Sequence, residues 1–220
     1  MVGDSLEEYY RARAPEYEQV YYRDDPARQA ELSAESERLA RLAAGKTVLE
    51  LACGTGWWTK AMSADAARIV ATDIAGETIA LAREKTYGCE VEFLVADMFT
   101  HEFEREAFDL VVLRFWFSHH PRQDFAKLFD ILTRPLRRGG LIWMMDNNPP
   151  APGTGGLTHQ TDKHGNNYKL RTLSNGQSYL VLKNYFSRNE LEVILGERFD
   201  IRSLIHQPYY WSVVVAPKGT

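Results

Sequence analysis

The chain has 220 residues, of which 45% are hydrophobic and 25% are charged, as in an average soluble globular protein. This length suits one domain, which buries about 70% of the surface of its unfolded chain, and two ordinary domains would each be small. A formal net charge of −4, without a long run of Lys or Arg, disfavours nucleic acid as a partner because phosphate contacts require a basic surface.

No targeting, membrane or metal-binding pattern is visible. The first eight residues are acidic and polar, unlike a signal peptide, and no run reaches the roughly 18 apolar residues of a membrane helix. The two cysteines, Cys53 and Cys89, make neither a disulfide framework nor a metal-ligand cluster. We therefore expect a cytoplasmic protein with no metal ion and a small-molecule partner; its oligomeric state stays open.

In chain order, residues 4–44 favour polar helices, with a break at Pro15 and an end at Gly45. Short apolar strands then alternate with helices. The strands are predicted at Thr47–Leu51, Arg68–Asp73, Val91–Ala96, Phe108–Leu113 and Gly140–Met145, and the helices at Trp57–Ala64, Gly76–Thr86 and Asp124–Leu136. This alternation predicts an α/β fold with a doubly wound parallel sheet.

The last third of the chain begins with a segment rich in Pro, Gly and Asn, 146–165, which predicts a mobile loop. Later elements are a hairpin, a capped helix and an antiparallel strand pair, predicted at Tyr168–Leu173 with Ser178–Lys183, at Ser187–Leu195, and at Phe199–Ile205 with Tyr209–Val215. We interpret the whole as a single domain, 1–220, with a helical cap (1–45), a core (46–146) and a lid with closing strands (147–220).

A glycine-rich segment, Glu50–Gly56, follows the first strand and precedes a helix. Glycines there let the backbone approach a ligand, and ligands of such sheets bind beyond the carboxyl ends of the strands. The third glycine of the dinucleotide fingerprint would fall at position 59, which is Thr59. A pyrophosphate loop is thus incomplete, which argues against one alternative, a nicotinamide-dependent oxidoreductase.

Two acids end the second and third strands. Asp73 lies 17 residues after Gly56, and its carboxylate can accept both ribose hydroxyls of a nucleoside; the alternative is a helix cap. Asp97 can accept a hydrogen bond from an adenine amino group while Met98 packs on the ring, and its alternative is a cap at the end of a strand. Each acid is a weak signal by itself.

Together these segments resemble the class I S-adenosylmethionine-dependent methyltransferases. Glu50–Gly56 is similar to their E-x-(A/G)-C-G-x-G motif, Asp73 to their ribose acid and Ala96-Asp97 to their adenine step. The resemblance implies a Rossmann-like sheet in the order 3-2-1-4-5-7-6 with strand 7 antiparallel, and S-adenosylmethionine as cofactor, converted to S-adenosylhomocysteine. The cofactor contacts that it implies in this core are Glu50, Ala52, Gly54, Gly56, Asp73, Ile74, Asp97, Met98 and Leu113.

A weaker resemblance reaches the N-terminus. Residues 9–17 are similar to the first helix of small bacterial methyltransferases, which implies that Tyr10, Arg13 and Tyr17 hold the carboxylate of the cofactor or close the site. An amphipathic packing helix is the alternative for each of them. Trp58 either borders the methionine part of the cofactor or packs in the core.

The acceptor pocket of this family follows strand four, where the chain reads Arg114-Phe115-Trp116-Phe117-Ser118-His119-His120. His119 is the candidate general base, and a surface histidine is the alternative. Arg114 either orients an acceptor oxygen or pairs with a nearby acid. The aromatic residues, Trp116 among them, suit a cationic methyl donor and an enclosed acceptor.

The predicted hairpin resembles one in small bacterial O-methyltransferases of natural-product pathways, such as the phosphonate O-methyltransferase of dehydrophos biosynthesis. That likeness implies that Arg171 and Lys183 lie over an anionic acceptor; solvated hairpin charges are the alternative. The sequence therefore predicts methyl transfer to an oxygen or nitrogen of a small, anionic molecule in secondary metabolism. A protein that binds the cofactor without catalysis remains a further alternative.

Overall fold

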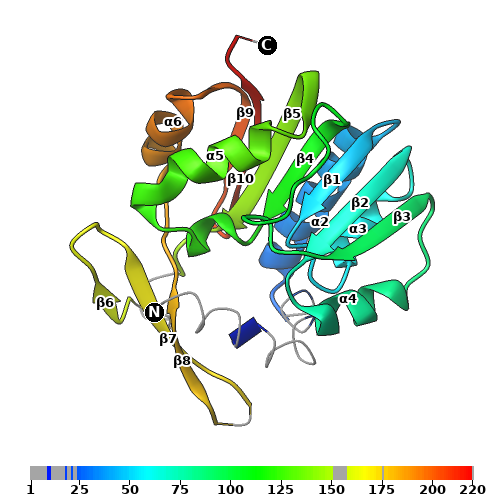
Figure 1. Cartoon of the computed structure of the whole chain (residues 1–220). Helices are drawn as coiled ribbons and strands as arrows, with labels where there is room; N and C mark the ends of the chain where they lie inside the picture. Colours follow the sequence, from blue (N-terminus) through cyan, green and yellow to red (C-terminus); the bar gives the residue numbers. More distant parts are fainter. Residues whose placement is uncertain are drawn as a thin grey trace.

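The computed structural model describes Tyr9, Tyr10, Glu18, Tyr21 and residues 24–150, 158–174 and 176–219. Its main sheet has the strand order β3-β2-β1-β4-β5-β10-β9 (Figure 1). The strands are β1 (Thr47–Leu51), β2 (Arg68–Asp73), β3 (Glu90–Val95), β4 (Phe108–Arg114), β5 (Leu136–Asn147), β9 (Phe199–His206) and β10 (Tyr210–Pro217). Strands β1 to β5 are parallel, and β10 is antiparallel to β5 and β9. The predicted order 3-2-1-4-5-7-6 with an antiparallel strand 7 is confirmed.

Helices cover both faces of this sheet (Figure 1). They are α2 (Pro26–Ala43), α3 (Trp57–Met62), α4 (Gly76–Arg83), α5 (Phe125–Thr133) and α6 (Arg188–Gly196), with short 3-10 helices η2 (Phe117–His119) and η3 (Arg122–Asp124). Because successive side chains of a strand point to opposite faces, Leu49 packs in the core with α5 and α6 whereas Val48 packs in the core with α2 and α3. The doubly wound architecture is confirmed.

The predicted helical cap includes α2, and the residues Asp25 and Pro26 account for its start. Asp25 Oδ1 accepts a hydrogen bond from the backbone N of Arg28 at 3.1 Å, and Pro26 occupies the first helical position, where its missing N–H costs nothing. Leu32 and Leu39 on the inner face are buried, so α2 is fixed on the sheet by its apolar stripe.

The fifth strand begins earlier than predicted. The helix expected to reach Leu136 ends at Thr133, because Leu136 pairs with Phe108 of β4. The register shifts between Phe108 and Leu110, and the left-handed Gly139 (φ 77°) lies in the extra length of β5. Strand pairing with a neighbour thus overrides local helical preference.

The predicted hairpin is confirmed and belongs to a second, three-stranded sheet in the order β6-β7-β8. Its strands are β6 (Gln160–Thr161), β7 (Asn167–Thr172) and β8 (Ser178–Leu182). Strand β6 lies in the segment that was predicted to be only a loop, and it forms because Gln160 and Thr161 pair with the edge of β7. Figure 1 shows this small sheet set apart from the main sheet.

The predicted capping box opens α6. Ser187 Oγ accepts a hydrogen bond from the backbone N of Glu190 at 3.3 Å, and Glu190 Oε2 accepts one from the backbone N of Ser187 at 2.8 Å. Across the described part of the chain, no helix has the length and apolar character needed to cross a bilayer.

Candidate active site

The loop after β1 brings bare backbone to the carboxyl end of the sheet. Ala52, Gly54 and Gly56 have φ angles of 54°, 57° and 77°, the left-handed conformation that favours glycine. A Cβ atom on Gly56 would lie 2.5 Å from the hydroxyl oxygen of Tyr87. Glycine is therefore required at position 56 for packing as well as for backbone conformation.

Asp73 ties this loop to the end of β2. Its Oδ2 accepts a hydrogen bond from the backbone N of Gly54 at 2.8 Å, and its Oδ1 accepts one from that of Ala75 at 2.9 Å. Burial raises the pKa of this carboxyl group above its usual value. Since a carboxylate has about four acceptor positions, each oxygen retains capacity for a ribose hydroxyl. Ile74, the next predicted contact, is 43% exposed.

Beneath the loop, Glu50 and Arg114 form a buried ion pair. Arg114 Nη2 donates to Glu50 Oε1 at 2.6 Å and to the carbonyl oxygen of Cys53 at 2.8 Å, and Thr59 Oγ1 donates to Glu50 Oε2 at 2.5 Å. The side chain of Arg114 is 1% exposed. The structure therefore shows the ion pair that was the alternative for Arg114, and this pair supports the loop. The contact of Arg114 with an acceptor oxygen stays a prediction.

Two further predicted cofactor contacts lie inside the core. Trp58 is fully buried and packs against the rings of Phe115 and Trp143, with centroids 6.1 Å and 5.8 Å away. Leu113 is also fully buried, on the opposite face with α5. Core packing is therefore observed for Trp58, and the cofactor contacts of Trp58 and Leu113 stay predictions.

After β3, Asp97 closes a turn. Its Oδ1 accepts a hydrogen bond from the backbone N of Phe99 at 2.9 Å, and Thr100 Oγ1 lies 3.4 Å from its Oδ2. This is the capping role that we gave as the alternative. The adenine contact of Asp97 stays a prediction, as does that of Met98, which is 8% exposed.

The candidate base, His119, has a defined tautomer. Its Nδ1 lies 2.5 Å from the carbonyl oxygen of Leu182, which can only accept, so Nδ1 carries the proton. Nε2 then accepts a hydrogen bond from the Tyr10 hydroxyl at 2.8 Å. Burial and the positive charge of Lys183 lower the pKa of His119 to about 3, so the ring is neutral with its basic nitrogen toward Tyr10.

The two histidines, His119 and His120, differ in their hydrogen-bond partners. The Nε2 atom of His120 lies 2.9 Å from the carbonyl oxygen of Asp124 and carries a proton by the same argument, while its ring stacks on Phe99 with centroids 5.5 Å apart. Tyr10, predicted to hold the cofactor or close the site, lies against His119. Arg13 and Tyr17 lie outside the described residues.

Lys183 lies close to His119 but is held by an acid. Its Nζ donates to Asp146 Oδ1 at 2.8 Å and to Ser118 Oγ at 2.6 Å. Burial alone would raise the pKa of Asp146, but the Lys183 ammonium outweighs it and holds the pKa below the usual value. The predicted acceptor contact of Lys183 therefore competes with a buried ion pair. Asp146 itself was not predicted, although its place at the end of β5 was a signal.

Arg171 and Lys169 lie on the inner face of β7, where alternate residues turn toward the protein. Within the described residues, the side chain of Arg171 makes no ion pair or hydrogen bond, and it lies near enough to His119 to lower the pKa of that imidazole. Sequence analysis placed Arg171 here and missed Lys169.

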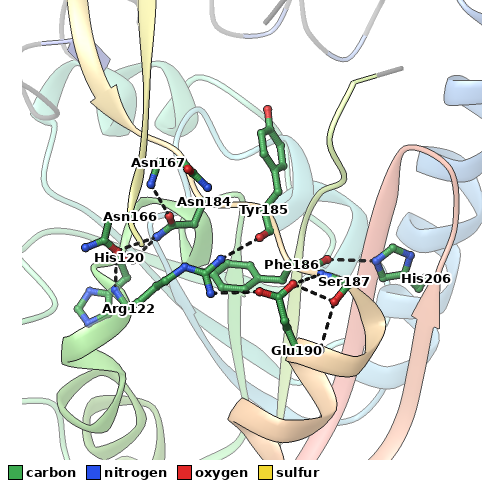
Figure 2. A network of polar contacts seen from close by, with 10 residues as sticks. All are labelled: His120, Arg122, Asn166, Asn167, Asn184, Tyr185, Phe186, Ser187, Glu190 and His206. Carbon is green, nitrogen blue, oxygen red and sulfur yellow. Dashed lines mark hydrogen bonds and ion pairs between the residues drawn. The ribbon is translucent and has the colours of Figure 1, made fainter. Parts of the chain in front are cut away.

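A polar network fixes the hairpin to the loop after β4 (Figure 2). Asn184 Nδ2 donates to the carbonyl oxygen of His120 at 3.1 Å, and Arg122 Nη2 donates to that of Tyr185 at 3.2 Å. Arg122 also pairs with Glu190 of α6 at 3.3 Å. These contacts hold the hairpin, which carries Lys169 and Arg171, against the loop that carries His119.

An aromatic wall completes the site. Trp116, predicted to contact the acceptor, is half-buried, and its ring centroid lies 5.3 Å from those of Phe99 and His120. Phe115 before it has a φ of 52°, a strained conformation for a bulky residue that is typical of functional turns.

Residues 48–140 match the family described as "Methyltransferase domain". Demethylmenaquinone methyltransferase of Thermus thermophilus is 36% identical over 126 residues, 56% of this chain and 56% of that protein. The enzyme of the same name from Clavibacter sepedonicus is 34% identical over 113 residues, 50% of this chain and 44% of that protein. The chain thus spans about half the length of these curated relatives.

Solved structures match nearly the whole chain. The complex of DhpI with SAH (S-adenosylhomocysteine) has 28% identity and a TM-score of 0.78, covering 100% of this chain and 98% of DhpI. The complex of DhpI with SAM (S-adenosylmethionine) and HEP has 28% identity and a TM-score of 0.76, with 98% of each chain covered. The PH0226 protein of Pyrococcus horikoshii, at 23% identity and a TM-score of 0.71, shares the fold over 92% of this chain and 99% of its own.

The sheet order and the glycine loop define a class I S-adenosylmethionine-dependent methyltransferase fold. The chain matches a methyltransferase domain over residues 48–140, and the SAH and SAM complexes of DhpI support S-adenosylmethionine as the cofactor.

Proposed function

We propose that this chain transfers the methyl group of S-adenosylmethionine to an oxygen of a small anionic molecule in natural-product biosynthesis. The observation that carries the proposal is His119, fixed as a neutral base beside the cation Arg171. A base and a cation on one side of a site suit an acceptor with both a hydroxyl group and a negative charge. The likeness to DhpI, which binds HEP together with SAM, supports a second small ligand beside the cofactor.

The residues at the strand tips fit the cofactor. When bound, S-adenosylmethionine supplies an electrophilic methyl group on a sulfonium ion. Asp73 would accept hydrogen bonds from its ribose hydroxyls, since each carboxylate oxygen is used only once by the backbone. Gly54 and Gly56 bring bare backbone beside it, and Asp97 with Met98 would bind the adenine ring.

His119 takes the acceptor's proton in this mechanism. Its Nε2 would receive the hydroxyl proton, directly or through the Tyr10 hydroxyl, and would so make the acceptor oxygen nucleophilic toward the methyl group that the bound cofactor would supply. A general base contributes typically 10²–10⁴-fold, or about 3–5 kcal/mol, whereas positioning both reactants contributes about 7–11 kcal/mol. Orientation by the rigid site therefore outweighs the base.

A bound anion would also strengthen that base. The pKa of His119 is low because the ring is buried and Lys183 and Arg171 are positive. A negative group near these cations offsets their charge and raises the pKa of His119 toward the operating pH, where a general base works best. Recognition of the anion and activation of the hydroxyl group are thus coupled.

The curated relatives favour a second candidate, a quinone-related acceptor, because both are named demethylmenaquinone methyltransferases. A flat, neutral ring would pack on the wall formed by Trp116 and Phe99 and would leave Arg171 without a role. The cations of the hairpin therefore favour the anionic acceptor.

The test is turnover with a panel of hydroxycarboxylates, hydroxyphosphonates, phenols, amines and quinols, with products identified by mass. We expect methylated hydroxy acids, and a large loss with Arg171→Ala but not with Arg188→Ala, an exposed arginine on α6. Methylation of neutral phenols, amines or quinols alone, with no response to Arg171→Ala, would overturn the anionic acceptor. Cofactor binding without product from any compound would leave a non-catalytic binding protein.

A further inference from the structure

Lys169 is a buried lysine that pairs with no acid in the described part of the chain. It lies in the middle of β7, opposite Val181, and is 2% exposed. Its Nζ donates to the hydroxyl oxygen of Tyr185 at 2.5 Å and lies 4.9 Å from the centre of that ring. No carboxylate among the residues described by the structure pairs with it. Lysine is almost never fully buried unless it is paired, because an isolated ammonium ion is costly to remove from water.

The charges around Lys169 are positive. Arg171 follows on the same face of β7, and Lys183 lies just beyond β8; both lower the pKa of Lys169, as does its burial, to about 8. The acid facing this cluster, Asp146, is hydrogen-bonded to Lys183. Among the residues that the structure describes, Lys169 and Arg171 therefore have no counter-ion.

Tyr185 adds a hydrogen-bond donor at the same place. Because Lys169 donates to the phenol oxygen, the phenol's own proton points elsewhere, and no acceptor for it exists among the described side chains and backbone. Figure 2 shows the ring directed away from the network that holds the Tyr185 carbonyl. Tyr185 is only partly buried, so this proton is accessible to an acceptor from outside the chain, such as an oxygen of a bound anion.

We propose that Lys169, oriented by Tyr185, binds the negatively charged group of the acceptor together with Arg171, while Lys183 stays on Asp146. The group is a carboxylate, phosphate or phosphonate, whose oxygens accept from the ammonium, the phenol and the guanidinium. The inference rests on the proposed function and deepens it. It assigns acceptor specificity to a lysine that an ordinary surface hairpin would expose to solvent.

The direct test is binding of methanesulfonate, which carries one negative charge at every pH used, to protein saturated with S-adenosylhomocysteine. A hydrogen bond to a charged group is worth about 1.5–3 kcal/mol, so Lys169→Met should weaken binding roughly 10- to 150-fold. Lys163→Met is the matched control, an exposed lysine in the same lobe, and should bind like wild type. Affinity for S-adenosylhomocysteine should be unchanged in both.

The pH profile separates anion binding from a structural role. An ammonium of pKa about 8 is charged below that pH, so wild-type affinity should be highest there and fall as the pH rises above about 8. Among the facing groups, Arg171 stays charged, His119 stays neutral and Lys183 is paired. Lys169→Arg should keep the affinity and remove the pH dependence, because a guanidinium does not titrate.

Equal affinity of wild type and Lys169→Met for methanesulfonate would overturn this inference, and so would a flat wild-type profile. If Lys169→Met fails to fold, the Lys169→Arg profile decides alone. The proposed function can be tested separately. If Lys169→Met methylates hydroxy acids as well as wild type does, only the present inference is overturned. Methylation restricted to neutral acceptors, with methanesulfonate binding still dependent on Lys169, would overturn the proposed function and would leave Lys169 in an anion site that the acceptor does not use.

Discussion

The cofactor side and the acceptor side of this protein treat charge differently. At the strand tips of the main sheet, Arg114 is neutralised by Glu50 and Asp73 is capped by two backbone N–H groups. On the inner face of the hairpin, Lys183 is neutralised by Asp146, but Lys169 and Arg171 have no counter-ion within the described residues. The first region satisfies its charges internally and the second does not.

This difference distinguishes the charged residues that hold the fold from those that we propose to bind a ligand. A buried ion pair with all partners present fixes geometry, as Glu50 and Arg114 do beneath the glycine loop. Cations without a counter-ion among the described residues lie next to His119, and the charge of Arg171 lowers the pKa of that imidazole. An anion from outside would stabilise such an arrangement, which supports the proposed anionic acceptor.

The largest effect is expected at the base. His119→Ala should lower turnover about 10²–10⁴-fold and leave the affinity for S-adenosylhomocysteine near wild type, because His119 lies on the acceptor side. His120→Ala is the control, since the ring nitrogen of His120 donates to Asp124. A greater loss of turnover in His120→Ala than in His119→Ala would show that His120 is the base.

The low pKa of His119 also predicts how kcat/KM depends on pH. Since the pKa of His119 is about 3, the base is unprotonated throughout pH 5–8, and kcat/KM should show no acidic limb from this group. An acidic limb near pH 6.5, abolished by His119→Ala, would show an imidazole with an ordinary pKa.

Breaking the neutralised pair should come next in size. Asp146→Leu leaves the Lys183 ammonium buried without its acid, and removal of one partner of a buried pair typically costs about 3–5 kcal/mol. Unfolding by denaturant measures this loss of stability. The double variant Asp146→Leu with Lys183→Met should recover much of the loss, whereas additive losses would show that the pair is not coupled.

Asp73→Ala tests the cofactor side. The loss of hydrogen bonds from ribose hydroxyls to a carboxylate should weaken S-adenosylmethionine binding roughly 10- to 150-fold, for about 1.5–3 kcal/mol. Calorimetry gives the affinity, and Asp65→Ala, a surface aspartate between α3 and β2, is the control. Unchanged affinity in Asp73→Ala would remove this residue from the site.

The smallest effect is expected from Arg171→Lys. Charge is retained but the two parallel hydrogen bonds of a guanidinium are lost, so the KM of an anionic acceptor should rise about tenfold, for roughly 1.4 kcal/mol. Steady-state kinetics with saturating S-adenosylmethionine measures it, and kcat should change less than KM. An unchanged KM would show that Arg171 acts only as a distant charge.

The fold followed from the sequence alone. Alternating apolar strands and helices specify a parallel sheet, and in a parallel sheet the strand ends converge at one edge. Glu50, Gly56, Asp73 and Asp97 were therefore expected at one edge of the sheet, and their contacts with the cofactor stay a prediction. The Ser187 capping box was sufficient to predict the start of α6, because it depends on residues within one turn.

Only the tertiary structure decided which charges are neutralised. Arg114 meets Glu50 across 64 positions of sequence, the His119 tautomer is set by Leu182 across 63, and Lys183 meets Asp146 across 37. The free energy of a buried charge depends on its partner and on its exclusion from water, and both arise from packing between distant segments. For this reason the sequence predicted a basic hairpin, but it could not show which two of its cations lack a counter-ion among the described residues.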